Sequence, residues 1–264
     1  MAINDTPFVY SGQGPVMMGR YDPVNGKAES GFLVDLYRIG CGTRTLTTTV
    51  SRETTMIRES CSGQRLDLAE LETGKSMTVA LSLAQFNGRT LAAALFGQVA
   101  EQAAGTVTEE PLPPLVAGDY FTTRHPKISS VVIEDSTPST PITYVEGTHY
   151  TIESAQHARL LLTAHPTAHV EPLKIDYEYE DYLNIAAFTA KNVERGIIFN
   201  GLNSAGQNVR VIVPRISLAM NGDFGWINEE EATLELSGSG LFVAELQNDP
   251  LFGAFMRVDL LGDE

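Results

Sequence analysis

Short stretches rich in Val, Ile, Thr and Leu, separated by turns that contain Gly, Asn or Pro, make up most of this chain. β-Branched side chains fit a pleated surface and disfavour a helix, so these stretches predict strands. The clearest is 232–238, where apolar and polar residues alternate as in a strand with one dry and one wet face. We therefore expect a mainly β protein. Outside the segment treated next, the expected strands are 32–39, 66–71, 76–86, 128–133, 142–145, 149–152, 158–163, 173–179, 197–203, 207–218 and 232–238.

The segment 43–60 is rich in threonine and polar on both of its expected faces. It predicts two strands, 43–50 and 53–60, which form a hairpin that projects from the body of the protein. A hairpin with two polar faces does not belong in a core, so we expect it to touch another chain. A second hairpin is expected around the turn 72–75.

One helix is predicted in this mainly β chain. Asn87 is a good N-cap, and Leu91, Leu95, Phe96 and Val99 recur at helical spacing in the Ala- and Leu-rich residues that follow. We therefore expect a helix at about 88–103. The prolines that follow, Pro111, Pro113 and Pro114, are expected to mark a linker.

The chain has 264 residues, of which 33 are acidic and 18 basic, and its formal net charge is −15. A protein that grips nucleic acid neutralises phosphates with lysine and arginine, so this balance argues against a DNA-binding surface. The acids gather near one end, because residues 223–264 contain ten acids and the single base Arg257. We therefore expect an acidic face that repels DNA.

The first residues, the apolar runs and the two cysteines indicate where such a chain would be found in a cell. The first residues lack the basic and apolar regions of a signal peptide, and no apolar run is long enough to span a membrane. Cys41 and Cys61 are too few and too far apart for a zinc ribbon or a disulfide scaffold. We expect them to be reduced thiols, although the predicted hairpin could also bring them face to face.

No set of residues in the sequence forms a recognisable catalytic or metal site. His165 and His169 have the spacing of a helical zinc motif, but Pro166 breaks the helix that would place both rings on one face. We expect them to be exposed loop histidines. The carboxylates of 229–231 point to alternating sides of an extended chain, and no nucleophile elbow or phosphate loop is present. We therefore expect no enzyme, no cofactor and no metal.

The C-terminal third carries a pattern that is similar to a known family. Residues 195–203 look like a strand that ends in a Phe-x-Gly-x-Asn turn, formed by Phe199, Gly201 and Asn203. On this pattern the chain resembles the major tail (tail tube) proteins of bacteriophages with long non-contractile tails. The other segments that agree in order are the opening 10–21, the helix around 91–96, and the closing strands 209–216 and 229–240.

The resemblance implies a β-sandwich or half-barrel flanked by one α-helix. Strands of neighbouring subunits would close into a β-barrel within a hexameric ring, and the rings would stack into a tube. The segment at about 115–185 would be an outward insertion or part of an enlarged sandwich. The other parts of this single tail-tube domain, 1–264, would be an N-terminal arm at about 1–30, an inter-ring hairpin at about 43–60, the helix at about 88–103, and closing strands with a C-terminal arm at about 193–264.

The function implied by the resemblance is a virion structural protein of the phage tail, assembled in the cytoplasm of the bacterial host. Its tube would be an acid-lined conduit for DNA ejection, through which DNA passes without specific binding. Its partners would be copies of itself, a tape measure protein inside the lumen, and terminator and distal tail proteins at the ends, with no membrane.

The resemblance also assigns roles to particular side chains. The family-like turn is Phe199, Gly201 and Asn203, as above. The candidate lumen-facing acids are Asp223, Glu229, Glu230, Glu231 and Glu235. The candidate inter-ring contacts are Thr45, Thr47, Thr49, Arg52, Glu53, Thr55 and Arg58.

Two alternatives remain open at this point. A related ring-forming tail component, such as a terminator or distal tail protein, would share the same layout. A non-catalytic β-sandwich binding module, for glycans for example, would need a platform of aromatic side chains. The tyrosines that lie close together in the sequence are Tyr177, Tyr179 and Tyr182.

Overall fold

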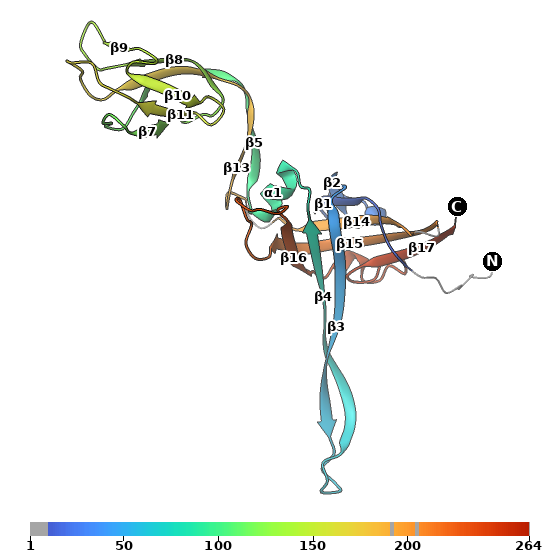
Figure 1. Cartoon of the computed structure of the whole chain (residues 1–264). Coiled ribbons are helices and arrows are strands. Elements are labelled where there is room, and N and C mark those ends of the chain that lie inside the picture. Colours follow the sequence, from blue (N-terminus) through green and yellow to red (C-terminus); the bar gives the residue numbers. More distant parts are fainter. Residues whose placement is uncertain (1–9, 191–192, 204–205, 264) are drawn as a thin grey trace. The chain divides into compact units, whose positions relative to one another are not determined.

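The computed structural model describes residues 10–190, 193–203 and 206–263. The sequence predicted one domain, but the contacts divide the chain into two compact units (Figure 1). Unit 1 consists of the described residues up to Val99 together with those from Ile185 onward, and unit 2 is Ala100–Asn184. Both units are built from strands, so the predicted mainly β class is confirmed. None of the helices in the described ranges is long and apolar enough to cross a membrane.

Unit 1 is built on an antiparallel eight-stranded sheet with the order β2-β1-β14-β15-β16-β4-β3, in which β17 also pairs with β15. The register of β1 with β14 sets Met17 opposite Ile198 and Val16 opposite Phe199. The strands of this sheet are β1 (Val16–Tyr21), β2 (Leu33–Gly40), β3 (Thr43–Arg58), β4 (Asp67–Leu83), β14 (Arg195–Leu202), β15 (Gln207–Met220), β16 (Leu234–Gly240) and β17 (Arg257–Asp263).

A proline lies inside the long strand β15, where it would normally break a ladder. Pairing with β17 ends at Ile212, and pairing with β16 begins at Ile216. Pro214 lies in the gap between these two partners, where its missing N–H deprives neither neighbour of a hydrogen bond. This position lets one strand serve two partners on the same side.

The main core of unit 1 lies between the sheet and α1 (Gly88–Ala94). Ala93 and Ala94 of the helix are buried in one cluster with apolar side chains from six strands. The largest of the fully buried residues in this cluster are Met18, Ile39, Met77, Leu81, Leu83 and Ile197.

The helix begins as predicted but ends early. Asn87 accepts a hydrogen bond from the Thr90 backbone N–H at 2.9 Å, which confirms the predicted N-cap. The predicted continuation to 103 is wrong. Phe96 adopts a left-handed φ of 51°, and the Gly97 N–H donates to the Ala92 carbonyl, which closes the helix as in a Schellman motif.

The two predicted hairpins are a single long one. β3 has 16 residues and β4 has 17, and they pair from Thr43 and Leu83 at the base to Arg58 and Asp67 at the far end. The expected turn at 72–75 is therefore part of β4. The reason is that the register continues past Gly74, which lies opposite Glu53 beside a β-bulge.

The true turn lies at 59–66, and Glu59 holds its first residues. Hydrogen bonds from the Ser62 side chain and from the backbone N–H groups of Ser62 and Cys61 lower the pKa of Glu59 to about 2. Gly63 follows with a positive φ of 76°, which favours glycine. This local chemistry sets the turn between the two positions that the sequence favoured, because 51–52 lies inside β3 and 72–75 lies inside β4.

Both cysteines are free and exposed. Cys41 precedes β3 and Cys61 follows it, so about 50 Å of extended chain separates them. The face-to-face arrangement that the predicted hairpin left open is therefore excluded.

Unit 2 is a β-sandwich with its own core. Its four-stranded sheet has the order β6-β12-β8-β9 and its three-stranded sheet the order β10-β11-β7. Ile133 and Ile175 of the first sheet share one buried cluster with Leu160 and Leu162 of the second. The strands are β6 (Gly105–Pro111), β7 (Tyr120–Thr122), β8 (Ile128–Glu134), β9 (Thr143–Tyr144), β10 (Tyr150–Ser154), β11 (Arg159–Leu162) and β12 (Lys174–Tyr179).

The proline-rich segment at 111–114 is not the linker that the sequence predicted. Leu112 is buried in the core of unit 2, and its N–H donates to the Leu173 carbonyl. Both chain crossings between the units lie instead in a two-stranded sheet, formed by β5 (Gln98–Gln102) and β13 (Tyr182–Ala186). The segment expected at about 115–185 thus corresponds to the greater part of a unit that already begins at Ala100 and ends at Asn184.

Each of the predicted arms contributes a strand to the unit 1 sheet. Val16–Tyr21, expected in an N-terminal arm, is the strand β1 between β2 and β14, and Arg257–Asp263 near the other end pairs with β15. The start of the predicted arm, residues 1–9, lies outside the described residues. Two short 3-10 helices complete unit 1, at Ala28–Ser30 and Ala244–Leu246.

A buried carboxylate organises the connections of unit 2. Asp135 is 1% exposed and accepts hydrogen bonds from the backbone N–H groups of Thr137, Ile142 and Val170. Burial alone would raise the pKa of Asp135, but these hydrogen bonds and that of the Thr137 hydroxyl lower it to about 2. The ionised form therefore fastens three loop positions of the sandwich.

Asp135→Asn should destabilise unit 2 by about 2 kcal/mol, because an amide can accept fewer of these hydrogen bonds. Because the pKa of Asp135 in the folded protein lies below its ordinary value of 3.8, the ionised carboxylate stabilises the fold at pH values above 3.8. This stabilisation is lost as the pH falls toward 2. Calorimetry should therefore show a difference between wild type and variant that is largest above about pH 4 and shrinks below it. Glu146→Gln, an exposed carboxylate in the same unit, is the control; an equal effect of both variants would contradict the assignment.

Candidate functional site

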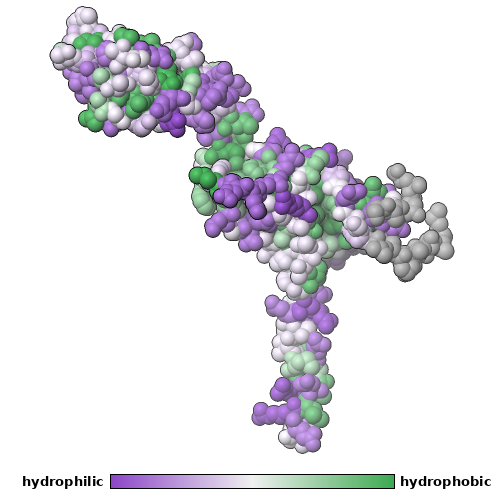
Figure 2. All heavy atoms as spheres, viewed as in Figure 1, coloured by the Kyte–Doolittle hydropathy of each residue, from purple (hydrophilic) through white to green (hydrophobic). Residues whose placement is uncertain are grey.

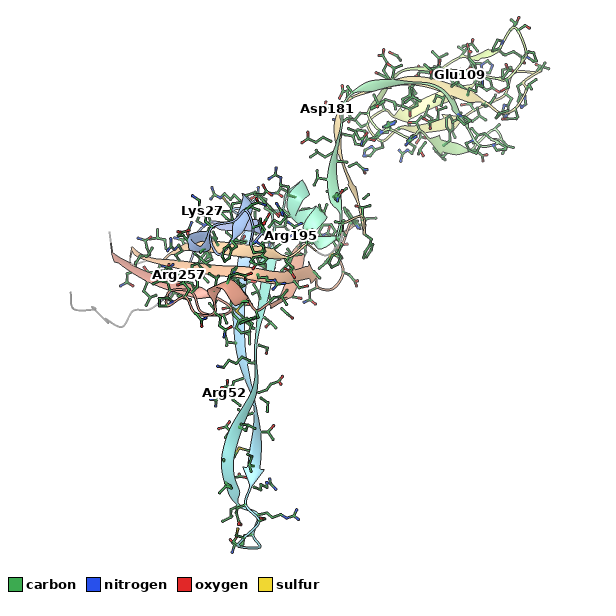
Figure 3. The ribbon with its side chains drawn as sticks, turned by 180° about the vertical axis from the view of Figure 1, so that it is seen from behind. Lys27, Arg52, Glu109, Asp181, Arg195 and Arg257 are labelled. Carbon is green, nitrogen blue, oxygen red and sulfur yellow. The ribbon has the colours of Figure 1, made fainter. Side chains whose placement is uncertain are left out.

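The most exposed element of unit 1 is the distal part of the β3–β4 hairpin. Every residue of β3 from Thr47 onward is exposed, whereas Met77, Val79, Leu81 and Leu83 at the base of β4 are buried. The hairpin therefore leaves the core and continues as a two-stranded ribbon, with Arg52 near its middle (Figures 1 and 3). A two-stranded ribbon alone is marginally stable in water, so this one depends on its buried base.

One face of the ribbon is charged. The register places Arg52 opposite Lys75 and Met56 opposite Glu70. Arg52 lies 3.6 Å from the carboxylate of Glu70, and Lys75 lies 3.0 Å from that of Glu72. These exposed ion pairs contribute little to stability, so the face is suited to a polar contact.

The opposite face is threonine-rich and, toward its tip, apolar. Thr55 pairs with Leu71 and Ile57 pairs with Ala69 on this face. Leu71 is 54% exposed and Ile57 is 45% exposed. Hydrophobic and hydrophilic side chains alternate along the ribbon, as Figure 2 shows. These exposed apolar side chains lie on a ribbon that has no core of its own, so they are available for contact.

The predicted inter-ring contacts all lie on β3 and are exposed, but they do not share a face. Five of them, including Thr49 and Glu53, alternate onto the threonine-rich face, whereas Arg52 and Arg58 lie on the charged face. Sequence reasoning missed Leu71 because it placed β4 in another hairpin.

The candidate lumen-facing acids lie in the β15–β16 connection and at the start of β16. Asp223, Glu229, Glu230 and Glu231 belong to the irregular segment 221–233, and Glu235 is in β16. Glu231 forms an ion pair with Arg44, and Glu235 accepts a hydrogen bond from the Ser82 hydroxyl. The expected strand alternation therefore applies to Glu235 alone.

The family-like turn joins β14 to β15. Phe199 packs against the main core, and a side chain at Gly201 would lie 2.5 Å from the Phe199 ring. Asn203 is 2% exposed; its Oδ1 accepts from the Gln207 N–H at 2.8 Å, and its Nδ2 donates to Gln207 Oε1 at 2.9 Å. The turn is thus a structural closure of the hairpin.

Asn203→Ala should lower the free energy of unfolding by about 1–2 kcal/mol, because it leaves the Gln207 N–H without its side-chain acceptor. Asn203→Asp keeps that acceptor and should lose less. Urea denaturation followed by circular dichroism measures both variants. Equal losses for alanine and aspartate would show that the hydrogen bond is not what matters.

His165, His169 and Glu171 bring potential metal-ligand atoms within 4.8 Å of one another. The histidines are half-buried, not exposed as predicted, and their rings stack at 3.9 Å. His165 Nε2 lies 2.9 Å from the Leu115 carbonyl and its Nδ1 lies 2.8 Å from the Tyr144 hydroxyl. A carbonyl only accepts, so Nε2 donates and Nδ1 accepts from Tyr144, which uses both nitrogens in structural contacts.

The tyrosines near the end of unit 2 do not form an open stacking platform. Tyr177 is buried, and Tyr179 stacks on His125 with ring centroids 4.0 Å apart. The Tyr182 hydroxyl lies 2.9 Å from His125 Nδ1. All three side chains are thus engaged with His125, and Tyr177 also packs against Tyr179, which disfavours the glycan-binding alternative.

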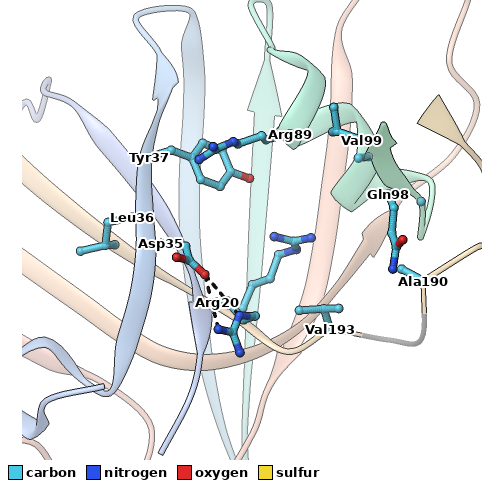
Figure 4. Close-up of a pocket in the computed structure, with 12 residues that line it drawn as sticks. Arg20, Asp35, Leu36, Tyr37, Arg89, Gln98, Val99, Ala190 and Val193 are labelled. Carbon is cyan, nitrogen blue, oxygen red and sulfur yellow. Dashed lines mark hydrogen bonds and ion pairs between the residues drawn. The ribbon is translucent and has the colours of Figure 1, made fainter. Parts of the chain in front are cut away.

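A pocket of about 510 Å³ in unit 1 gathers three arginines, and we call it the arginine pocket (Figure 4). Arg20 of β1 and Arg195 of β14 are directly opposite in the antiparallel register, an arrangement that costs stability for like charges. Arg89 of α1 lies 5.7 Å from the centroid of the Tyr37 ring. This pocket could not be predicted from the sequence, because its residues come from distant segments.

Within the described ranges, the carboxylates near this pocket pair with Arg20 alone. Asp35 lies 3.4 Å from the Arg20 guanidinium, and Asp22 lies 3.1 Å from it. Asp22 also accepts hydrogen bonds from the backbone N–H groups of Val24 and Asn25, so it belongs to a turn. Burial raises the pKa of the Tyr37 hydroxyl, while the charges of Arg195 and Arg89 oppose that shift.

Comparison with known protein families gives a match over most of the chain. The family described as Protein of unknown function UCP028589 matches residues 9–259. No curated protein matches the chain.

Proposed function

The chain belongs to the UCP028589 family, and we propose that it is a structural subunit of the tail tube of a long non-contractile-tailed bacteriophage. Its copies would form hexameric rings that stack into a tube, and the tube would conduct DNA into the host. The proposal rests on the resemblance of the sequence to tail tube proteins. The single observation that supports it best is the long two-faced hairpin.

The hairpin supports stacking because it offers what a contact between rings needs. Its distal part extends from the unit 1 sheet and exposes both an apolar stripe and a charged face. Intramolecular contacts do not explain these exposed side chains. A neighbouring copy that covered Ile57 and Leu71 would remove their apolar surface from water, which is favourable.

The unit 1 sheet supports ring closure because it is open. β2 and β3 are the end strands of its order, and within the described ranges neither pairs on its outer side. Exposed edges are a liability that closure between copies removes. A barrel assembled from several such sheets is our proposed lining of the tube.

Acidic side chains would line this channel. Phosphates passing such a surface are repelled, so DNA can slide without adhering. The tape measure protein would occupy the lumen before ejection, and terminator and distal tail proteins would close the ends. Unit 2 has its own sandwich core, so we propose it as an addition to the tube subunit.

Electron microscopy of the purified chain should show rings or tubes of uniform bore. Rings that never extend would favour a terminator or distal tail role instead. A monomer at every concentration and salt condition would overturn the proposal.

A shortened hairpin tests stacking separately from folding. Arg52 and Lys75 are paired, so a two-residue Asn-Gly turn can replace residues 53–74 and join them directly. This variant should keep the thermal transition of unit 1, because the removed residues are almost all exposed, but it should no longer form tubes. Electron microscopy and calorimetry measure the two outcomes.

Point variants sharpen the same test. Ile57→Ser with Leu71→Ser removes the apolar stripe and should impair stacking in the same direction. Val24→Ser is the matched control, because Val24 is 87% exposed on unit 1 outside the hairpin. If tubes still form with the shortened hairpin and with the doubly substituted hairpin, the hairpin is not the contact between rings.

A further inference from the structure

The arginine pocket is positively charged in a protein whose net charge is −15. Among the described residues, neither Arg89 nor Arg195 has a carboxylate at ion-pair distance. Arg195 also lies opposite Arg20 in the sheet, which places two cations side by side. Asp22 and Asp35 pair with Arg20 alone, so an anion in the pocket would compensate the charges of Arg89 and Arg195.

The walls of the arginine pocket add an apolar preference. Leu36, Ala92, Val99 and Val193 line it together with the arginines. Leu36 is 40% exposed, so it offers contact area to a ligand. The volume suits several side chains and not a single small ion. The pocket chemistry therefore fits an acidic peptide segment that also carries an apolar residue.

The connection 221–233 of this same chain has that chemistry. It contains four acids and no base. Ile227 is 98% exposed and Trp226 is 73% exposed, and both lie a few residues before Glu229. Among the described residues, Glu229 and Glu230 form no ion pair, so their charges are free to meet a partner.

Contacts hold the segment 221–233 near its start and near its end, while Trp226 and Ile227 between them are exposed. Phe224 packs edge-on against Phe86 with ring centroids 5.4 Å apart. Glu231 pairs with Arg44 on the other side. The residues between these anchors, 225–230, form what we call the acidic loop. A loop held at both sides loses less conformational freedom on binding than a free segment.

We propose that the arginine pocket of one copy binds the acidic loop of a second copy. Glu229 and Glu230 would lie against Arg89 and Arg195, and Ile227 would contact the apolar wall. Pocket and loop are different surfaces, so the contact is head-to-tail, and such contacts generate rings when the rotation closes.

This inference rests on the proposed function only where it concerns the number of copies in a ring. The contact between the arginine pocket and the acidic loop requires only two copies. It assigns Glu229 and Glu230 to a subunit contact. Asp223 and Glu235 remain candidates for the channel lining.

The test uses the single tryptophan of the chain. A synthetic peptide of residues 221–233 contains Trp226, and the full-length Trp226→Phe variant contains no tryptophan, so the anisotropy of tryptophan fluorescence reports binding of the peptide. We expect saturable binding that weakens as salt rises. Arg89→Ala with Arg195→Ala in the receptor should weaken it at least about tenfold, because two charge-assisted contacts are lost.

Three controls make the result specific. Arg124→Ala, an exposed arginine in unit 2, should leave binding unchanged. A peptide with Glu229→Gln and Glu230→Gln should bind as weakly to the wild-type pocket as the normal peptide binds to the alanine receptor. Calorimetry shows whether the alanine receptor is folded; if it is not, Arg195→Glu with a Glu229→Lys, Glu230→Lys peptide tests the same contact by charge exchange.

Absence of binding, or equal binding to the folded alanine receptor and to wild type, would overturn the inference. These outcomes are distinct from failure of the proposed function. If tubes assemble normally when Arg89 and Arg195 are both replaced by alanine, the proposed contact is wrong and the tube function is unaffected. If the pocket binds the peptide but the chain never forms rings, the tube function is wrong and the contact is supported.

Discussion

The continuity of β4 from buried core to exposed tip is the constraint on which unit 1 depends. At its base, four alternating apolar side chains lie in the main core, and the same strand then carries the hydrogen-bond ladder of the ribbon outward. The core therefore fixes the register of residues that have no core of their own. A one-residue slip at Met77 would exchange the two faces of the ribbon along its whole length.

The sequence predicted strands better than it predicted their partners. Strands such as 128–133 and 197–203 were located because a few residues carry the pattern. The turn of the long hairpin was misplaced because Gly74 looks like a local turn, whereas the register of the entire ladder absorbs it opposite Glu53. The helix end was missed for a similar reason, since Phe96 takes a left-handed conformation that composition does not reveal.

The candidate sites divide in the same way. The exposure of Thr47 and Thr55 could be predicted from composition, since polar residues on both faces rule out a core strand. The arginine pocket could not, because Arg20 and Arg195 are brought together only by the pairing of β1 with β14. Arg89 then reaches the same place from a helix.

The ribbon of β5 and β13 has a consequence for how such a chain can change. Unit 2 is entered and left through two adjacent, paired strands, and it brings a complete core with it. A segment whose two ends are already side by side can be lengthened, exchanged or removed without altering the spacing that the rest of the chain must span. Unit 2 is therefore built as an inserted domain that can be exchanged as a whole. Selection can act on it separately from the sheet of unit 1.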